Sequence, residues 1–305
     1  MTLPPEFHDL AKRVSNWGRW GDDDERGTLN LIDADALRRG ASCVRTGKTF
    51  SLALPLDEDG PQTGVIPGRD NPAHRMVAVN MAYTEDFHTS DDAVSMGLQA
   101  ATHWDALAHV SHDDRLYNGF PASTITEQGA ARCGIDKAGP IVSRGVLLDV
   151  ARALGVERID GPRAIGGDEL DAACELGGVT IESGDIVLIR TGQVQVFKGG
   201  DRDGYGHPSP GPGMEAVAWF RDHDAAAVAT DNLTFEVFPC ERDDAFMPVH
   251  LLDLVYMGLT QGQNFDLEAL AADCADDGVH QFLLSASPEP FTAATGFPVN
   301  PVAVK

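Results

Sequence analysis

The chain has 305 residues, of which 43% are hydrophobic, so it is long enough to bury a large core as one domain or two close lobes. It carries 23 Lys and Arg residues against 47 Asp and Glu residues, a formal net charge of −24. Such an acidic surface repels nucleic-acid phosphates and anionic lipids, so neither is expected as a partner.

Cysteine usage and the N-terminal sequence favour a soluble cytoplasmic protein. The five cysteines are widely scattered without CxxC spacing, which argues against a disulfide framework and against a thiolate zinc site. The first residues lack the apolar segment of a signal peptide. No apolar run reaches the roughly 18 residues that a membrane span requires.

Taken in chain order, the elements predict a mixed α/β fold. Asp33 before an apolar-periodic run and Gly40 after it predict a short capped helix. Residues 59–75 are rich in Pro and Gly and predict a long loop, either a lid or binding loop or plain surface. Short apolar runs typical of strands covered on both faces occur at 51–56, 76–81, 145–150, 185–190, 225–230 and 281–286. Helical stretches lie between them at 167–174, 213–222, 247–256 and 266–274. Because no convincing linker divides the chain, we expect a single domain over 1–305 with an N-terminal extension of about 1–45.

The segment QAATHWDALAH, residues 99–109, carries the candidate chemistry. Residues two apart in an extended chain lie on one side, so His103 and Asp105 can converge on one point. Gln99 can join through its amide oxygen, and His109 has the same even spacing. An imidazole together with a carboxylate suits zinc or manganese, and a bound divalent ion generates hydroxide from water near neutral pH.

A histidine and an aspartate two residues apart form a weak motif, and a satisfied polar cluster is the competing interpretation. The surrounding residues are mainly apolar, and buried charges and imidazoles in such a stretch need partners, which a metal ion would supply. Trp104 either forms a wall of an aromatic pocket or packs in the core. No dinucleotide-binding GxGxxG, Walker loop or GxSxG elbow is present, so activated water is favoured over a side-chain nucleophile.

The chain resembles the cyclase/arylformamidase-like metal hydrolases, which include kynurenine formamidase and isatin hydrolase. The family pattern HxGTHxDxPxH stands here as QAATHWDALAH. Co-ordered similarity extends over most of the chain: NWGRWGDDDERGTLNLI, RGVLLDV, SGDIVLIRTG, AVATDN, VHLLDLVYMGLTQGQNFDLEALAADC and GFPVNPVAV. The resemblance implies a swivelling β/β/α fold with a central mixed sheet, assembled as a homo-oligomer such as a dimer or tetramer.

The resemblance also assigns roles to individual residues. Gln99, His103 and Asp105 occupy the family's metal-binding positions, and His109 occupies its proton-transfer position. The later family positions correspond to His250, as a catalytic or metal-supporting residue, and Gln263, as a metal ligand. A separate expectation places Asp231 at a strand end, where it either orients a ligand or lies on the surface.

Two departures from the family pattern bear on the metal. Gln99 stands in place of histidine, and Gln263 stands where many members have glutamate. An amide oxygen is a poorer donor to zinc, so we expect one divalent ion at most, and manganese in preference to zinc.

The sequence therefore favours a metal-dependent hydrolase that opens a cyclic amide or cleaves an aryl formamide, acting on a small aromatic or cyclic molecule. Two alternatives stay open. One is a lactone hydrolase or biosynthetic cyclase that uses the same site, and the other is a ligand-binding protein whose metal site is degraded.

Overall fold

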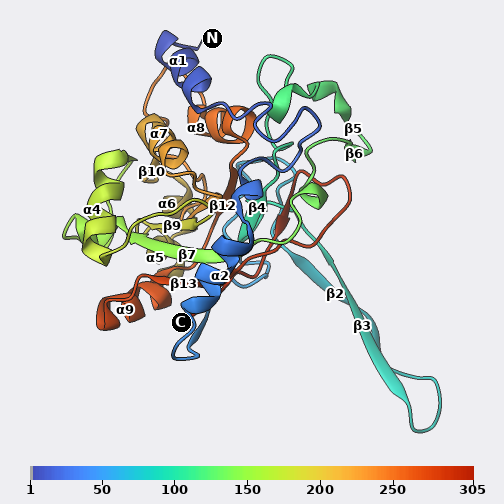
Figure 1. Cartoon of the computed structure of the whole chain (residues 1–305). Coiled ribbons are helices and arrows are strands. Elements are labelled where there is room, and N and C mark those ends of the chain that lie inside the picture. The colour runs from blue at the N-terminus through green and yellow to red at the C-terminus, as the bar shows by residue number, and fades with distance from the viewer. Residues whose placement is uncertain (1–2) are drawn as a thin grey trace.

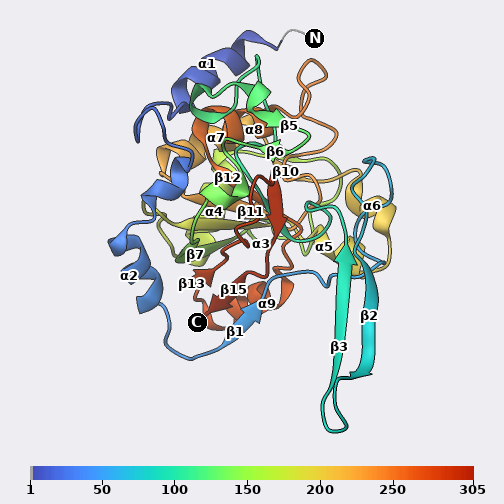
Figure 2. The ribbon, with the colours of Figure 1, turned by 90° about the vertical axis from the view of Figure 1, so that its right-hand side faces the viewer.

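A mixed sheet organises the computed structural model, which describes residues 3–305 (Figures 1 and 2). Residues 1 and 2 of the predicted N-terminal extension lie outside the described part. The strands of this sheet follow the spatial order β1-β15-β13-β7-β9-β11-β12-β4-β14. Their bounds are β1 (Thr49–Ser51), β15 (Val302–Val304), β13 (Gln281–Ser285), β7 (Val142–Asp149), β9 (Ile186–Arg190), β11 (Ala227–Thr230), β12 (Thr260–Gln263), β4 (His103–Asp105) and β14 (Gly296–Pro298).

The centre of the sheet is parallel and buried on both faces. Strands β7, β9, β11 and β12 pair in parallel, and antiparallel strands flank them on either side. Alternate residues of β9 enter different cores, with Val187 and Ile189 in one and Ile186 and Leu188 in the other. Burial on both faces explains the continuous apolar runs of these strands.

Helices cover the sheet and supply the rest of both cores. The helices are α1 (Pro5–Val14), α2 (Ala34–Ser42), α3 (Val150–Ala153), α4 (Gly167–Gly177), α5 (Val194–Lys198), α6 (Arg202–Gly206), α7 (Met214–Asp222), α8 (Pro248–His250) and α9 (Glu268–Asp277). A π-helix, η5 (Leu251–Met257), continues α8, and short 3-10 helices are η1 (Gly27–Leu31), η2 (Tyr117–Gly119), η3 (Ala122–Thr124) and η4 (Ile135–Lys137). Buried residues of α1, α4 and α7 share one core, and those of α9 belong to the other. The mixed α/β fold expected from the sequence is thereby confirmed.

Most of the predicted elements occur, but two of the apolar runs behave differently. The run at 51–56 is strand only to Ser51, where β1 ends, and Ala53 then makes an isolated bridge to Phe265. The next residue in the register on β15 is Pro301, which has no N–H to donate to a ladder, and this is a reason for the early end. The run at 76–81 lies in β2 (Ala73–Ala82), whose residues are almost all exposed, so the prediction of a buried strand there is wrong.

Strands β2 and β3 (His88–Ser95) form an arm that extends away from the main sheet (Figures 1 and 2). The two strands pair only with each other. Smaller two-stranded pairs join β5 (Ile125–Thr126) to β6 (Gly129–Ala130) and β8 (Ala164–Ile165) to β10 (Gly211–Pro212).

The N-terminal segment is tied to the π-helix and to the end of α7. Asn16 Nδ2 donates to the Met257 carbonyl at 2.9 Å, and Trp17 Nε1 donates to the Val255 carbonyl at 2.7 Å. Arg19 pairs with both carboxylate oxygens of Asp224, at 2.7 and 2.8 Å. The predicted capped helix is α2, in which the Asp33 side chain accepts hydrogen bonds from the backbone N–H groups of Asp35 and Ala36. None of the helices within residues 3–305 has the length and apolar character that crossing a lipid bilayer requires.

Candidate active site

Strand β4 carries His103 and Asp105 on one face and Trp104 on the other. It runs antiparallel to β12, with His103 opposite Gln263 and Trp104 opposite Gly262. Since side chains alternate along a strand, Gln263 and Gln261 share the face of His103 and Asp105. This pairing, at the carboxyl end of a central parallel strand, assembles the site from segments about 160 residues apart.

Trp104 packs in the core. The interpretation that it forms a wall of an aromatic pocket is therefore not supported. Its ring is fully buried and meets Phe265 edge-on, with the ring centroids 5.2 Å apart. Its Nε1 donates to the Ala286 carbonyl at 2.8 Å.

The contact between His103 and Asp105 leaves two acceptor atoms facing each other. His103 Nδ1 lies 2.7 Å from the Ala101 carbonyl, and a carbonyl only accepts, so Nδ1 carries a proton. In the neutral ring Nε2 then bears a lone pair, and it lies 3.3 Å from Asp105 Oδ1. Both atoms are buried without a hydrogen-bond partner. A cation between them would satisfy both.

The second oxygen of Asp105 is held by amides from β12. Gln263 Nε2 donates to Asp105 Oδ2 at 2.6 Å, and Gln261 Nε2 lies 3.5 Å from the same oxygen. Burial opposes ionisation of Asp105, but the neighbouring His109 and His103 outweigh it, so the pKa of Asp105 is lowered. An ionised Asp105 is therefore the stable form, and its negative charge is available to a cation.

His109 stands beside the same carboxylate and reaches the cavity. Its Nε2 lies 3.8 Å from Asp105 Oδ1. Burial lowers the pKa of His109 below its ordinary value of 6.5, although the charge of Asp105 works in the opposite direction. A neutral imidazole in this position can accept a proton.

His250 is oriented by a buried carboxylate. Its Nδ1 lies 2.6 Å from Glu236 Oε1, and its backbone N–H donates to the same oxygen at 2.9 Å. The Val249 N–H donates to Glu236 Oε2 at 3.2 Å. A carboxylate on Nδ1 fixes the ring and its tautomer, which leaves Nε2 as the free proton-transfer atom.

A cavity of about 480 Å³ connects these groups to solvent. His109, His250 and Gln263 line it, whereas the fully buried His103 and Asp105 are not among the lining residues. The remaining lining residues are mostly apolar and include one charged side chain: Ile66, Arg69, Val110, Ser111, Leu233, Thr234, Phe246, Met247 and Leu251. An apolar cavity with a few convergent polar groups is typical of a small-molecule site.

Gln99 is placed apart from the other predicted ligands. Its Nε2 donates to Thr295 Oγ1 at 3.3 Å, and its amide packs against Gly296, where a Cβ would come within 2.7 Å of it. Five of the six site residues expected from the sequence therefore gather around Asp105 and the cavity, and Gln99 turns toward β14.

The residues present fit a divalent ion in part. His103 and Asp105 are two matched donors with orphaned buried atoms, and His109 lies close to the same carboxylate oxygen. However, no group of three or more His, Cys, Asp or Glu side chains within residues 3–305 is arranged to hold a metal ion. A bound ion would need amide, water or substrate oxygens to complete its coordination.

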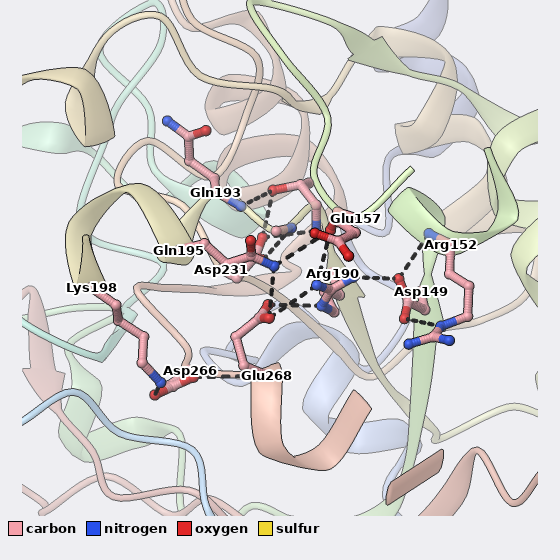
Figure 3. A network of polar contacts seen from close by, with 12 residues as sticks. Asp149, Arg152, Glu157, Arg190, Gln193, Gln195, Lys198, Asp231, Asp266 and Glu268 are labelled. Atoms are coloured by element: carbon pink, nitrogen blue, oxygen red, sulfur yellow. Dashed lines mark hydrogen bonds and ion pairs between the residues drawn. The ribbon is translucent and has the colours of Figure 1, made fainter. Parts of the chain in front are cut away.

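Asp231 lies in a separate polar network at the ends of the parallel strands (Figure 3). It accepts hydrogen bonds from the N–H groups of Thr191 and Gly192, and from the Thr191 hydroxyl. In the same network Arg190 pairs with Asp149 and Glu268. Asp231 thus joins the end of β9 to the end of β11, and its contacts do not include the predicted ligands.

The sequence of the chain matches the family described as putative cyclase over residues 49–237, more than half of its length. The chain belongs to this family. The match includes the segment 99–109 and Glu236, and it ends before His250. No curated protein matches the chain.

Several solved structures are similar to this chain in fold. A crystal structure described as a novel cyclase is 36% identical, with a TM-score of 0.88, and the match covers 96% of this chain and 100% of that one. Isatin hydrolase A from Ralstonia solanacearum is 19% identical, with a TM-score of 0.64 over 89% of this chain and 95% of its own. A predicted metal-dependent hydrolase from Bacillus stearothermophilus is 16% identical, with a TM-score of 0.54 over 85% and 98%.

Two residues of the site had no assigned role in the sequence analysis. Glu236 follows a strand end at the expected edge of the sheet, but its bond to His250 depends on how the intervening loop closes. Arg69 lies in the Pro- and Gly-rich loop, where no periodicity predicts the direction of a side chain. The Pro- and Gly-rich composition of that loop was the only sequence signal that pointed to a binding role for this segment.

Proposed function

We propose that this cyclase-family protein is a metal-dependent hydrolase that opens a cyclic amide or cleaves an aryl formamide. The proposal is supported by fold similarity to a protein named as an isatin hydrolase and to one named as a metal-dependent hydrolase. The apolar cavity with two histidines suits a small aromatic or cyclic substrate.

The facing lone pairs of His103 and Asp105 carry the proposal. With His103 neutral, the two buried acceptor atoms 3.3 Å apart repel each other, and a cation between them removes this repulsion. A divalent ion at this point would be held by His103 and Asp105, with Gln263 completing the set if its amide turns its oxygen inward. With one carboxylate and at most amide support, we expect a single ion, manganese in preference to zinc.

A bound divalent ion supplies polarisation of the substrate carbonyl and a lowered pKa for attacking water. The neutral His109 accepts the proton from that water as its oxygen adds to the carbonyl carbon. The carbon–nitrogen bond then breaks, and His109 returns the proton to the leaving nitrogen. His250, fixed by Glu236, orients the tetrahedral intermediate through Nε2, whose lone pair accepts a hydrogen bond from a hydroxyl group of the intermediate.

The same residues can act on a lactone or in a ring-closing reaction, because both proceed through attack at a carbonyl. A third function, a ligand-binding protein without turnover, is favoured by the composition of the metal site. The described residues lack a complete metal cluster, and the family's metal-binding histidine is replaced by Gln99.

We also propose that the protein assembles as a homo-oligomer through the β2–β3 arm. The arm exposes large hydrophobic side chains on both of its strands, including Val79 and Val94, and its strands do not pair with the main sheet. A lone two-stranded hairpin is marginally stable in water, so a second copy of the chain is the expected cover.

A metal-reconstituted hydrolysis screen tests the proposed function. Protein loaded with Mn²⁺ or Zn²⁺ is assayed against isatin, N-formylkynurenine and an aryl lactone. The proposal predicts turnover of the amide substrates, loss of this turnover when a chelator is added, and greater recovery with Mn²⁺ than with Zn²⁺. Turnover of the lactone alone favours the second function, and metal-free protein that binds aromatic ligands without turnover favours the third.

A further inference from the structure

Arg69 is the one charged residue other than histidine that lines the active-site cavity. It lies at the end of the predicted loop 59–75, just before β2. Two backbone hydrogen bonds hold this part of the loop: Arg69 N–H donates to the Ile66 carbonyl at 3.2 Å, and Gly97 N–H donates to the Asp70 carbonyl at 2.9 Å. A Cβ at residue 97 would come within 3.0 Å of Arg69 Cα, so glycine there allows the loop to pack closely.

The guanidinium of Arg69 has no anionic partner within residues 3–305. Burial lowers the pKa of Arg69, and the more distant charge of Asp105 is the only influence in the opposite direction. The two other arginines without an ion pair or a side-chain hydrogen bond, Arg45 and Arg75, are exposed to water. Among the partly buried arginines of residues 3–305, Arg69 alone makes neither an ion pair nor a side-chain hydrogen bond, although the chain has twice as many acidic as basic residues.

The surroundings of Arg69 define what it can bind. Ile66, Leu233 and Phe246 give the cavity apolar walls, and His109 and Gln263 are its polar groups. The planar guanidinium presents a fork of N–H donors that matches a carboxylate with two parallel hydrogen bonds. An apolar body with one carboxylate would therefore fill the cavity and supply the missing anion.

We propose that Arg69 binds the carboxylate of an acidic ligand whose apolar body occupies this cavity. The carboxylate has two chemical sources. It is either a group already present on the substrate or the group that hydrolysis of the amide creates, and the second source rests on the proposed function. In both cases Arg69 is a specificity residue, which selects an acid over the corresponding neutral molecule.

Calorimetric binding of a matched pair of ligands tests the proposal without any need for turnover. The pair is phenylglyoxylate and its neutral amide, phenylglyoxylamide, measured with and without chelator. We expect the wild-type chain to prefer the acid. Arg69→Gln should weaken binding of the acid at least about tenfold and leave binding of the amide unchanged. Arg69→Lys should lose less affinity for the acid because it keeps the positive charge. The exposed Arg75→Gln, six residues along the chain, is the matched control and should change neither.

Binding of the acid and of the amide can each contradict the proposal. Equal binding of acid and amide by the wild-type chain overturns the proposal, as does acid binding by Arg69→Gln at wild-type strength. Thermal unfolding of each variant checks that the fold is kept, which we expect because the Arg69 side chain makes no hydrogen bond. If the chain shows no hydrolysis at all, the proposed function fails while the binding result still stands.

The two sources of the carboxylate differ in kinetics. If the product supplies it, Arg69→Gln should weaken product inhibition at least about tenfold with little change in kcat/KM for a neutral amide. If the substrate carries it, the variant should lower kcat/KM for the acidic substrate by a similar factor. Variant kinetics that match wild type on both counts would contradict the role of Arg69.

Discussion

At the scale of single residues, the buried pair His103 and Asp105 is the feature that most needs a chemical explanation. The other polar atoms of the pair have partners: two glutamine amides face Asp105 Oδ2, and His103 Nδ1 is bound to a carbonyl. The remaining atoms, His103 Nε2 and Asp105 Oδ1, lie 3.3 Å apart, and in the neutral form of His103 neither donates a proton to the other. Because leaving buried polar groups unpaired costs about 1–3 kcal/mol each, an arrangement with two such groups indicates a function.

His109→Ala tests whether proton transfer by His109 is separate from metal binding by His103 and Asp105. The variant removes the proton acceptor and leaves His103 and Asp105 in place, so metal content should stay unchanged while kcat falls by about 10²–10⁴-fold. Elemental analysis and steady-state kinetics of the same preparation measure both. Turnover close to wild type would remove the role of His109.

The sequence could predict this group of residues because the motif is local. His103 and Asp105 share a face whenever the segment is extended, and the match of the whole pattern to a family added His250 and Gln263. The position of Arg69 could not be predicted, since it depends on the packing of an irregular loop against Gly97. The direction of Gln99 depends on β14, which arrives from the far end of the chain.

At the scale of elements, the contact between the N-terminal segment and α7 depends on charge. Arg19 and Asp224 form a two-bond ion pair with side chains 29% and 28% exposed, and Arg221 adds a third bond to Asp224. The hydrogen bond from Arg19 lowers the pKa of Asp224 below its ordinary value of 3.8. The stabilisation from this pair is therefore present above about pH 4 and is lost as the pH falls through the lowered pKa.

Asp224→Asn isolates that contribution. The residue has φ of 47°, a conformation that asparagine tolerates well, so the change removes the charge with little backbone cost. We expect the free energy of unfolding to fall by about 1 kcal/mol near pH 7, with a smaller difference from wild type near pH 3, where the carboxylate is largely protonated in the unfolded chain. Denaturant unfolding at the two pH values measures it. A difference that persists unchanged at low pH would show that the carboxylate charge is not its cause.

The burial of a strand determines whether its composition predicts it. Strands β7, β9, β11 and β13 were found from short apolar runs, because burial fixes their composition. An equally apolar run gave the exposed β2. In the proposed assembly a partner chain covers this strand, and such a strand has the same composition as one covered by its own helices. Composition does not distinguish these two forms of cover.

At the scale of the whole molecule, the β2–β3 arm is the feature that a single chain leaves unexplained. Its side chains include Val79, which is 66% exposed, and Val94, which is 58% exposed. A net charge of −24 opposes association through the general surface, so the exposed apolar side chains of the arm are the expected contact.

Val79→Asp tests the arm as an interface. A carboxylate in an apolar contact between copies would be desolvated, so we expect the variant to shift toward monomer in light scattering coupled to size exclusion. Val156→Asp, at a 45% exposed position far from the arm in sequence, is the control and should keep the wild-type mass. A monomeric wild-type chain would contradict the proposed assembly.

The metal content of the purified chain tests the central claim most directly. After loading with Mn²⁺ and desalting, the wild-type chain should retain about one ion, and both His103→Ala and Asp105→Asn should lose most of it. His74→Ala, at an exposed histidine on the arm, is the matched control and should retain the ion. A wild-type chain that retains none, or site variants that retain as much as the control, would contradict the claim that His103 and Asp105 share one cation.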